Sequence, residues 1–287
     1  MLIATLAVSF AAILIRMSDA HAFVIAFWRL AIATVAMLGI GTVLGKTSDL
    51  RRIRADREFL LLVISGFFLA VHFASWTLSL EYTSVAASVA IVDSSPIIVA
   101  ILSLLILKES VSKTQITGIV LAVVGAAIIG LVDSSGTESL FGNALAFIGA
   151  AAVAVYLIIG RTSRTRLSTF SYVIVVYGFC AFFLLVASFS VNASIITDDL
   201  SQYLLFLLLA LGPSCLGHSL YNYALGHIRA PIVSTTTLGE AVGSTILAVF
   251  ILSEIPGPIF VVGAFILFAG VILTLEPWKE TINSKYS

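Results

Sequence analysis

The stretch "ILSLLILKESVSKTQITGIVLAVVG" (residues 101–125) decides the fold, because its pattern returns later in the same chain. A shift of 145 residues places it over "ILAVFILSEIPGPIFVVGAFILFAG" (residues 246–270) without a gap. The identical pairs are Ile101 and Ile246, Leu102 and Leu247, Ile106 and Ile251, Leu107 and Leu252, Glu109 and Glu254, Gly118 and Gly263, and Gly125 and Gly270. Matching leucines are common in apolar sequence, whereas a glutamate and two glycines in register are not. The shift predicts a duplicated unit.

The composition around this stretch is that of a membrane protein. Hydrophobic residues make up 60% of the chain, charged residues 10%, and the mean hydropathy is +1.14, so too little polar surface exists to cover a soluble globule. Apolar runs long enough to cross a bilayer as helices predict spans at 1–16, 22–44, 59–80, 84–107, 114–132, 140–160, 170–191, 203–224, 229–252 and 258–276. We therefore expect an all-α integral membrane protein of ten transmembrane helices, with five-helix repeats in residues 1–133 and 134–287.

Lysine and arginine residues gather in every second connection. The segments after the second, fourth, sixth, eighth and tenth runs hold five, two, three, one and two of them, which is 13 of the 15 basic residues. Cytoplasmic loops retain such residues, so we expect a multi-pass protein of the cell membrane with both termini in the cytoplasm. The two exceptions are Arg29, inside the second run, and Arg16, at the outer end of the first, where we expect Asp19 to pair with it.

Five crossings per repeat is an odd number, so the second repeat must enter the membrane from the opposite side. Inverted repeats of this kind are typical of secondary transporters, which alternate access around a site near the midplane. The longest polar connection runs only from Gly45 to Glu58, which excludes a soluble catalytic or nucleic-acid-binding domain.

Two smaller features concern the first run and the cysteines. The first run begins at Met1 without basic residues and ends at Arg16, which is unlike a secretory signal; its short length indicates a tilted helix or residues missing upstream. Cys180 and Cys215 lie inside apolar runs, so we expect them to be packing residues rather than a disulfide or metal pair.

Several of these residues resemble a known family. The acidic residues that close the fourth and ninth helices, Pro96 within the fourth, and the ending "LILKES" (105–110) are similar to the EamA family of the drug/metabolite transporter superfamily, and the resemblance covers essentially the whole chain. It implies a ten-helix carrier with a central cavity that exports amino acids or other small metabolites. It also implies a proline after an acidic residue in the ninth helix, where this chain has Glu240 followed by Ala241.

Charged residues within apolar runs are the first candidates for a substrate site, because a charge near the bilayer centre costs about 2.5–3.5 kcal/mol on insertion scales. Glu240 falls near the middle of the ninth run, after "STTT" (234–237). Asp93 precedes Pro96, which removes a backbone hydrogen bond and is expected to break the fourth helix. For each carboxylate, the alternative is a structural hydrogen bond or plain packing.

Further candidates lie on three other helices. Arg29 sits seven residues inside the second run, and a substrate carboxylate, a structural ion pair or snorkelling are its alternatives. Polar faces at helical spacing are formed by His72 and Trp76 in the third run, and by His218, Tyr221 and Asn222 in the eighth. A satisfied structural hydrogen bond is the alternative for each histidine.

Two patterns are assigned to structure instead. The stripe Gly118, Ala122, Ala126 and Gly130 favours packing within the chain over a dimer contact. Helix capping or solvation near the headgroups accounts for Glu109 and Glu254. The hydrolase, zinc-protease and phosphate-loop motifs are absent from the sequence, and no cofactor or metal is expected.

Three functional hypotheses follow. The first is a carrier for small metabolites such as amino acids, in which Glu240 or Asp93 could also carry a coupling proton. The second is an exchanger of anions or nucleotide conjugates, for which Arg29 provides little positive charge. The third, a membrane-embedded enzyme, needs clustered catalytic groups, whereas the polar residues here are spread over five helices. We expect a small-molecule substrate and the lipid bilayer as partners; the direction of transport and the oligomeric state stay open.

Overall fold

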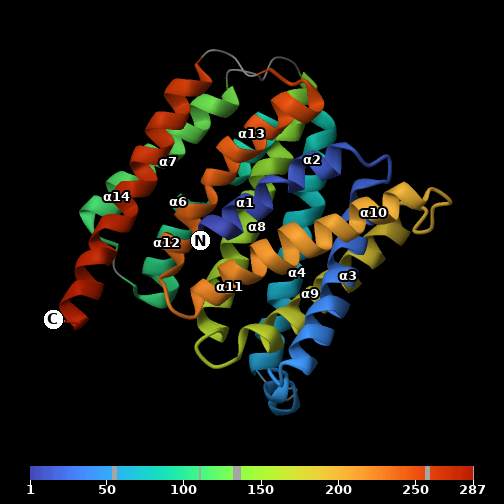
Figure 1. Ribbon diagram of the computed structural model, residues 1–287, viewed down its shortest axis with the longest axis horizontal. Coiled ribbons are helices and arrows are strands. Elements are labelled where there is room, and N and C mark those ends of the chain that lie inside the picture. The colour runs from blue at the N-terminus through green and yellow to red at the C-terminus, as the bar shows by residue number, and fades with distance from the viewer. Residues whose placement is uncertain (54–56, 110, 132–136, 256–258, 287) are drawn as a thin grey trace.

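The computed structural model describes the backbone of residues 1–53, 57–109, 111–131, 137–255 and 259–286, and side chains except at 52, 129–131, 137–139 and 275–286. The part described is built of helices (Figure 1). The helices of the first half are α1 (Leu2–Ser9), α2 (Ala11–Arg16), α3 (Ala22–Val43), η1 (Ser48–Arg52), α4 (Arg57–Tyr82), α5 (Val85–Val92), α6 (Ser95–Leu102), η2 (Ser103–Leu107) and α7 (Lys113–Leu131). Those of the second half are α8 (Thr137–Ser163), α9 (Thr169–Ser190), α10 (Leu200–Leu209), η3 (Ala210–His218), α11 (Ser219–Leu225), α12 (Ala230–Thr237), α13 (Gly239–Leu252) and α14 (Phe260–Tyr286).

The apolar helical segments coincide with the predicted runs to within a few residues. Seven segments of the described chain are long and apolar enough to cross a membrane: Ala22–Val43, Arg57–Tyr82, Val85–Leu107, Leu140–Ser163, Thr169–Ser190, Leu200–Leu225 and Ala230–Leu252. The shorter apolar segments are Leu2–Arg16, Lys113–Ile128 and Phe260–Thr274. The chain is therefore a multi-pass, all-helical membrane protein.

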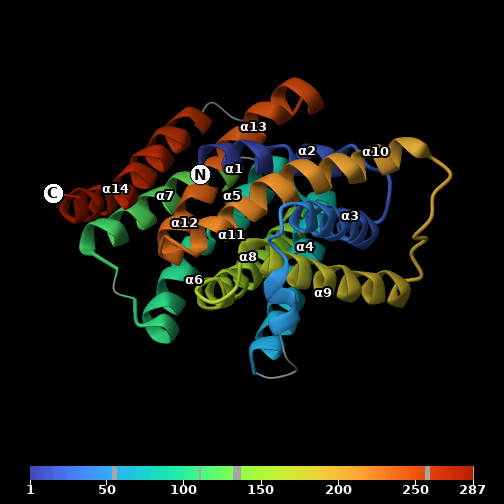
Figure 2. The same ribbon diagram turned by 60° about the horizontal axis from the view of Figure 1, so that its bottom comes forward.

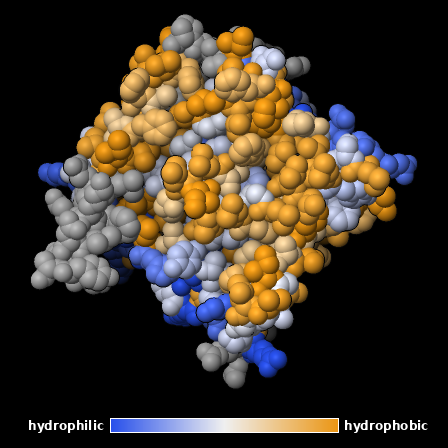
Figure 3. Space-filling view, viewed as in Figure 1, coloured by the Kyte–Doolittle hydropathy of each residue, from blue (hydrophilic) through white to orange (hydrophobic). Residues whose placement is uncertain are grey.

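The outer surface of the bundle is apolar. Large hydrophobic side chains are exposed on helices throughout the chain, including Val43 (87% exposed), Phe250 (82%) and Phe265 (75%). Figure 3 shows hydrophobic residues across the middle of one face, with hydrophilic residues gathered at the right margin and along the lower edge. Such a band matches the hydrocarbon layer of a bilayer, where lipid tails cover apolar side chains.

Two membrane segments are broken near their middle. The helix α5 ends at Val92, and α6 begins at Ser95 with Pro96 in its first turn, where the missing N–H needs no partner. The helix α12 ends at Thr237 and α13 begins at Gly239. No proline is needed at this second break, because three successive threonines, 235–237, donate their hydroxyls to carbonyls of their own turn, which competes with regular helix.

The eighth predicted run is distorted rather than broken. It continues from α10 through the π-helix η3, which contains Pro213, into α11. A proline inside a helix removes one backbone hydrogen bond and crowds the preceding turn, and a wider π-type turn accommodates this. The distortion places Ser214 in the interior, fully buried.

The helices α7 and α14 lie side by side in Figures 1 and 2, and glycines make the contact close. A Cβ atom on Gly125 would come within 2.6 Å of the Gly263 carbonyl oxygen, and one on Gly118 within 2.7 Å of the Gly270 carbonyl oxygen. The predicted stripe of small residues thus packs within the chain, against α14; the side-chain surroundings of Gly130 lie outside the part described.

Contacts between connections place the two ends of the bundle. At one end, the amide of Ser168 donates to Asp49 Oδ2 at 3.0 Å, so the α8–α9 connection lies beside the α3–α4 connection. At the other end, Ser18 Oγ and the Asp19 amide donate to Gln202 Oε1 at 2.6 and 3.3 Å. The expected pairing of Arg16 with Asp19 is wrong, because the two terminal nitrogens of Arg16 bond the Leu80 carbonyl oxygen and, at 2.8 Å, Glu254 Oε1 instead.

Candidate functional site

A small cavity lies at the centre of the bundle, between the two broken helices. Its volume is about 40 Å³, which holds a few water molecules. Its walls are formed by Val8, Ala11, Arg29, His72, Trp76, Val92, Asp93, Ser95, Val153, Leu157, His218, Tyr221, Thr237 and Glu240. Seven of the predicted site residues are in this lining; the two that are not are Asn222 and Pro96.

Arg29 is the positive charge of the cavity. Its side chain is 1% exposed, its Nε donates to Ser214 Oγ at 2.7 Å, and its Cζ lies 4.2 Å from the centroid of the Phe73 ring. The two terminal nitrogens, Nη1 and Nη2, are buried without a hydrogen-bond partner. A buried guanidinium with unpaired donors is costly unless an acceptor arrives, and these nitrogens present the fork that binds a carboxylate.

Two carboxylates face the same cavity. Asp93 occupies the break between α5 and α6, opposite Thr237 at the break between α12 and α13, and its Oδ2 is buried without a partner. Glu240 lies in the first turn of α13 and is 8% exposed. Neither carboxylate hydrogen-bonds to Arg29, whose one bonded nitrogen is held by Ser214. Opposite charges therefore line one small space without neutralising each other in a direct contact.

Aromatic and imidazole rings form another wall. His72 Nδ1 lies 3.0 Å from the Gly149 carbonyl oxygen, and the ring stacks on Trp76 with centroids 6.0 Å apart. His218 contacts both His72 and Phe73, at 6.3 and 5.2 Å between centroids. The Trp76 Nε1 is buried without an acceptor, so this wall offers one further unused donor.

The two polar residues of α11 differ in their roles. Tyr221 lines the cavity, and its hydroxyl lies 3.0 Å from Thr5 Oγ1. Asn222 instead donates to the His218 carbonyl oxygen at 2.8 Å and to the Tyr156 hydroxyl. Asn222 therefore braces its helix against α8 and does not reach the cavity.

Sequence reasoning overlooked two contributors to the site, Ser214 and Phe73, and noted Thr237 only within the "STTT" run before Glu240. Ser214 follows Pro213, and that neighbour is the signal that could have marked it. Phe73, which supports the Arg29 guanidinium, carries no such signal, because it is one aromatic residue in an apolar run. Among the described residues, no group of three or more His, Cys, Asp or Glu side chains is placed to hold a metal ion.

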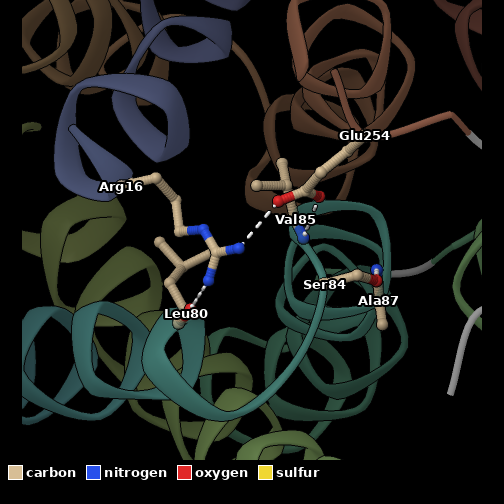
Figure 4. A network of polar contacts seen from close by, with 6 residues as sticks. All are labelled: Arg16, Leu80, Ser84, Val85, Ala87 and Glu254. Carbon is tan, nitrogen blue, oxygen red and sulfur yellow. Dashed lines mark hydrogen bonds and ion pairs between the residues drawn. The ribbon is translucent and has the colours of Figure 1, made fainter. Parts of the chain in front are cut away.

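Ion pairs close both ends of the bundle. Arg16 Nη2 lies 2.8 Å from Glu254 Oε1, while Arg16 Nη1 donates to the Leu80 carbonyl oxygen at 2.6 Å and the Val85 amide donates to Glu254 Oε2 at 3.2 Å (Figure 4). Val85 opens α5, and the hydroxyl of the preceding residue, Ser84, caps that helix.

At the opposite end, Arg161 Nη2 lies 2.9 Å from Glu109 Oε1, and Arg161 Nη1 donates to the Leu225 carbonyl oxygen at 2.8 Å. Solvation therefore does not account for Glu109 and Glu254, because each is bonded to an arginine of the other half of the chain. Helix capping accounts for Glu254 only in part, through the Val85 amide at the start of α5. Sequence reasoning missed these pairs since their members are 52 and 238 residues apart.

Comparison with known proteins gives three findings. The model of the EamA-like transporter family matches twice, over residues 1–131 and 140–276. A protein of Bacillus subtilis (strain 168) named "Uncharacterized transporter YyaM" is 29% identical over 159 residues, which are 53% of this chain and about half (51%) of that relative's length. One crystal structure superposes with a TM-score of 0.78 over 98% of this chain and 96% of its own, at 16% identity, a likeness that concerns the fold alone.

Proposed function

Because the chain belongs to the EamA-like transporter family, we propose that it is a secondary transporter that exports a small zwitterionic metabolite, such as an amino acid, by alternating access. One observation carries the substrate class. The central cavity is lined by Arg29, with two buried unpaired nitrogens, and by Asp93, with a buried unpaired oxygen. A zwitterion brings the complementary carboxylate and ammonium groups together in one small molecule.

The proposed pose follows from this geometry. The substrate carboxylate accepts from the two free nitrogens of Arg29, while its ammonium group donates to Asp93 and Glu240. Each charge-assisted hydrogen bond in such a buried site contributes about 1.5–3 kcal/mol. The rings of His72 and Trp76 border the space left for an apolar side chain, and the cavity of about 40 Å³ must widen to admit it, which makes the structure a closed state.

We further propose that the chain crosses the membrane ten times as two inverted five-helix repeats, 1–133 and 134–287. Three observations support this: the family model matches each half, the broken helices α5 and α12 are 145 residues apart at both of their ends, and the end contacts of Arg16 and Leu80 return at Arg161 and Leu225. We also propose that the membrane is the cell membrane and that both termini are cytoplasmic, which the distribution of basic residues supports.

Three modes of transport are compatible with this site: coupling to a proton on Glu240 or Asp93, exchange, and facilitated diffusion down the substrate gradient. The charges that line the cavity also argue against the alternative function of an anion or nucleotide-conjugate exchanger. Arg29 is its one guanidinium, and it is balanced by two carboxylates, a charge pattern that disfavours phosphate. We favour transport over a membrane-embedded enzyme because the family that the chain matches is one of transporters.

The test is uptake into liposomes that contain the purified protein. Labelled amino acids, nucleotide sugars and phosphorylated metabolites are compared, with and without a pH gradient, for the wild type and Glu240→Gln. The matched control is Glu81→Gln, which removes an exposed carboxylate outside the cavity.

Saturable amino-acid uptake that falls at least tenfold in Glu240→Gln and is unchanged in Glu81→Gln supports the proposal, and dependence on the pH gradient assigns a coupling proton. Uptake confined to phosphorylated compounds refutes the zwitterion class. Amino-acid uptake that is equal in the wild type and Glu240→Gln removes Glu240 from the binding site.

A further inference from the structure

The ion pairs at the two ends of the bundle occupy equivalent positions in the two halves of the chain. Arg16 of the first half bonds Glu254 of the second, and Arg161 of the second half bonds Glu109 of the first. The two arginines are 145 residues apart, and so are the two glutamates. Each pair therefore ties one half to the other, and neither lies within a single half.

The match extends to the backbone around each pair. The carbonyl oxygens that accept from the arginines belong to Leu80 and Leu225, which are also 145 residues apart. The residues before the glutamates, Lys108 and Ser253, both adopt the left-handed conformation, with φ of 55° and 58°. Agreement in partner, distance and backbone conformation indicates two copies of one device, rather than two unrelated surface contacts.

The two copies lie at opposite ends of the path through the molecule. Arg16 precedes the start of α3, whereas Arg161 lies just before the α8–α9 connection, which contacts Asp49 beyond the end of α3. A helix of 22 residues is about 33 Å long at 1.5 Å per residue. The central cavity, lined by Arg29 from about one third of the way along α3, lies between the two pairs.

Each pair is placed beside a short helix that leads to the cavity. Glu254 bonds the Val85 amide at the start of α5, and α5 ends at Asp93 in the cavity wall. An acceptor charge at a helix N-terminus is favourable. At the other end the equivalent donor is the Ala230 amide at the start of α12, yet the second oxygen of Glu109 is buried without any partner. Both oxygens of Glu254 are thus bonded, whereas Glu109 Oε1 takes both Arg161 contacts, from Nε at 3.0 Å and Nη2 at 2.9 Å, and Oε2 has none.

We propose that these pairs are the two gates of transport, an outer latch formed by Arg16 and Glu254 and an inner latch formed by Arg161 and Glu109. Release of a latch frees the start of its short helix, α5 or α12, and opens the cavity to that side. The state described here holds the outer latch complete and the inner latch one hydrogen bond short. This proposal rests on the transport function proposed above.

The experiment measures from which side the cavity is reached. Ser95→Cys places a thiol in the cavity wall, in a Cys215→Ala background, and the remaining Cys180 is fully buried. A membrane-impermeant thiol reagent is added to whole cells or to inside-out vesicles. We expect Glu254→Gln to raise the labelling rate from the outside about tenfold, and Glu109→Gln to raise it from the inside to a similar extent.

The matched control is Glu81→Gln, which neutralises another carboxylate in the pocket beside the outer latch and should leave labelling unchanged. Exchange of the charges, Arg16→Glu with Glu254→Arg, restores the ion pair but not the bonds to the Leu80 carbonyl and the Val85 amide. Outside labelling should therefore fall between the rates of the wild type and Glu254→Gln, which a misfolded protein would not do. Labelling that rises on the same side in both glutamine variants, or in neither, overturns the proposal.

This readout needs no substrate, so it separates the two proposals. Opposite shifts in labelling, combined with no uptake of any zwitterion by the wild type, support the latches and refute the substrate class. Zwitterion uptake by the wild type combined with unshifted labelling refutes the latches and leaves the transport proposal standing.

Discussion

Replacement of Gly125 by alanine should separate α7 from α14. The added Cβ would lie 2.6 Å from the Gly263 carbonyl oxygen and 2.7 Å from Leu267 Cα, whereas ordinary contact begins at 3.4 Å. These obstacles, and the still closer Leu267 nitrogen, are backbone atoms, which cannot rotate away as a side chain can, so the helices must part by at least 0.8 Å. A gap of 0.5–1 Å forfeits roughly a quarter to a half of the dispersion energy of the atoms along it.

Overpacking of this kind typically costs about 1–3 kcal/mol, so we expect Gly125→Ala to lower the free energy of unfolding by about 2 kcal/mol. At roughly 2–4 °C per kcal/mol, the midpoint of thermal unfolding in detergent should fall by about 4–8 °C. The assay is a melting curve of the purified protein followed by tryptophan fluorescence or by loss of the monodisperse peak in size exclusion.

The matched control is Gly39→Ala on α3, where an added Cβ has no atom within 4 Å. This variant should melt with the wild type or slightly above it, because alanine favours helix over glycine. Equal melting of the two variants would show that α7 and α14 are not in the close backbone contact described, and the reasoning would fail.

Three further predictions concern single hydroxyl and carboxylate groups. Ser84→Ala removes the N-terminal cap of α5 and should destabilise the protein by about 1 kcal/mol, visible as a lower melting midpoint. Asp199 accepts hydrogen bonds from the hydroxyl and amide of Ser201, which lowers the pKa of the Asp199 carboxyl. These bonds therefore stabilise the fold above the ordinary aspartate pKa, and the stabilisation is lost as the pH falls through the lowered pKa. Asp199→Asn should abolish this part of the acid dependence of the melting midpoint. Ser214→Ala removes the acceptor of Arg29 Nε and should weaken zwitterion uptake about tenfold in KM. The buried Nε left without an acceptor should also lower the melting midpoint by a few degrees, and a single cooperative melting transition checks that the fold persists.

The membrane segments were predictable because their physical cause is local. A run of apolar residues must be helical in lipid, and the runs at 22–44 and 170–191 match helices Ala22–Val43 and Thr169–Ser190 almost residue for residue. Glu240 and Asp93 could be singled out for a similar reason, since a charge inside an apolar run is expensive wherever the chain folds. Their meeting in one cavity required the structure.

What could not be predicted depends on contacts between distant segments. Arg16 has an acidic residue three positions away, yet its partner is Glu254, because the end of α2 faces the end of α13 in the folded bundle. Asn222 shares a helical face with His218 by spacing, but it bonds Tyr156 on another helix. The spacing of residues along the sequence determines on which side of a helix a side chain lies. Only the packing of the helices determines which residues that side contacts.

The contact between α7 and α14 has a consequence for ancestry. Gly118 meets Gly270 and Gly125 meets Gly263, and under the proposed duplication Gly118 and Gly263 descend from one codon, as do Gly125 and Gly270. In one contact the first glycine position of the first repeat meets the second glycine position of the second repeat, and in the other contact the roles of the repeats are exchanged. This reciprocal pairing is the pattern of a self-complementary homodimer interface. This seam is where two separate five-helix polypeptides, inserted in opposite orientations, would have met before their genes fused, so the present chain carries a former subunit boundary inside it.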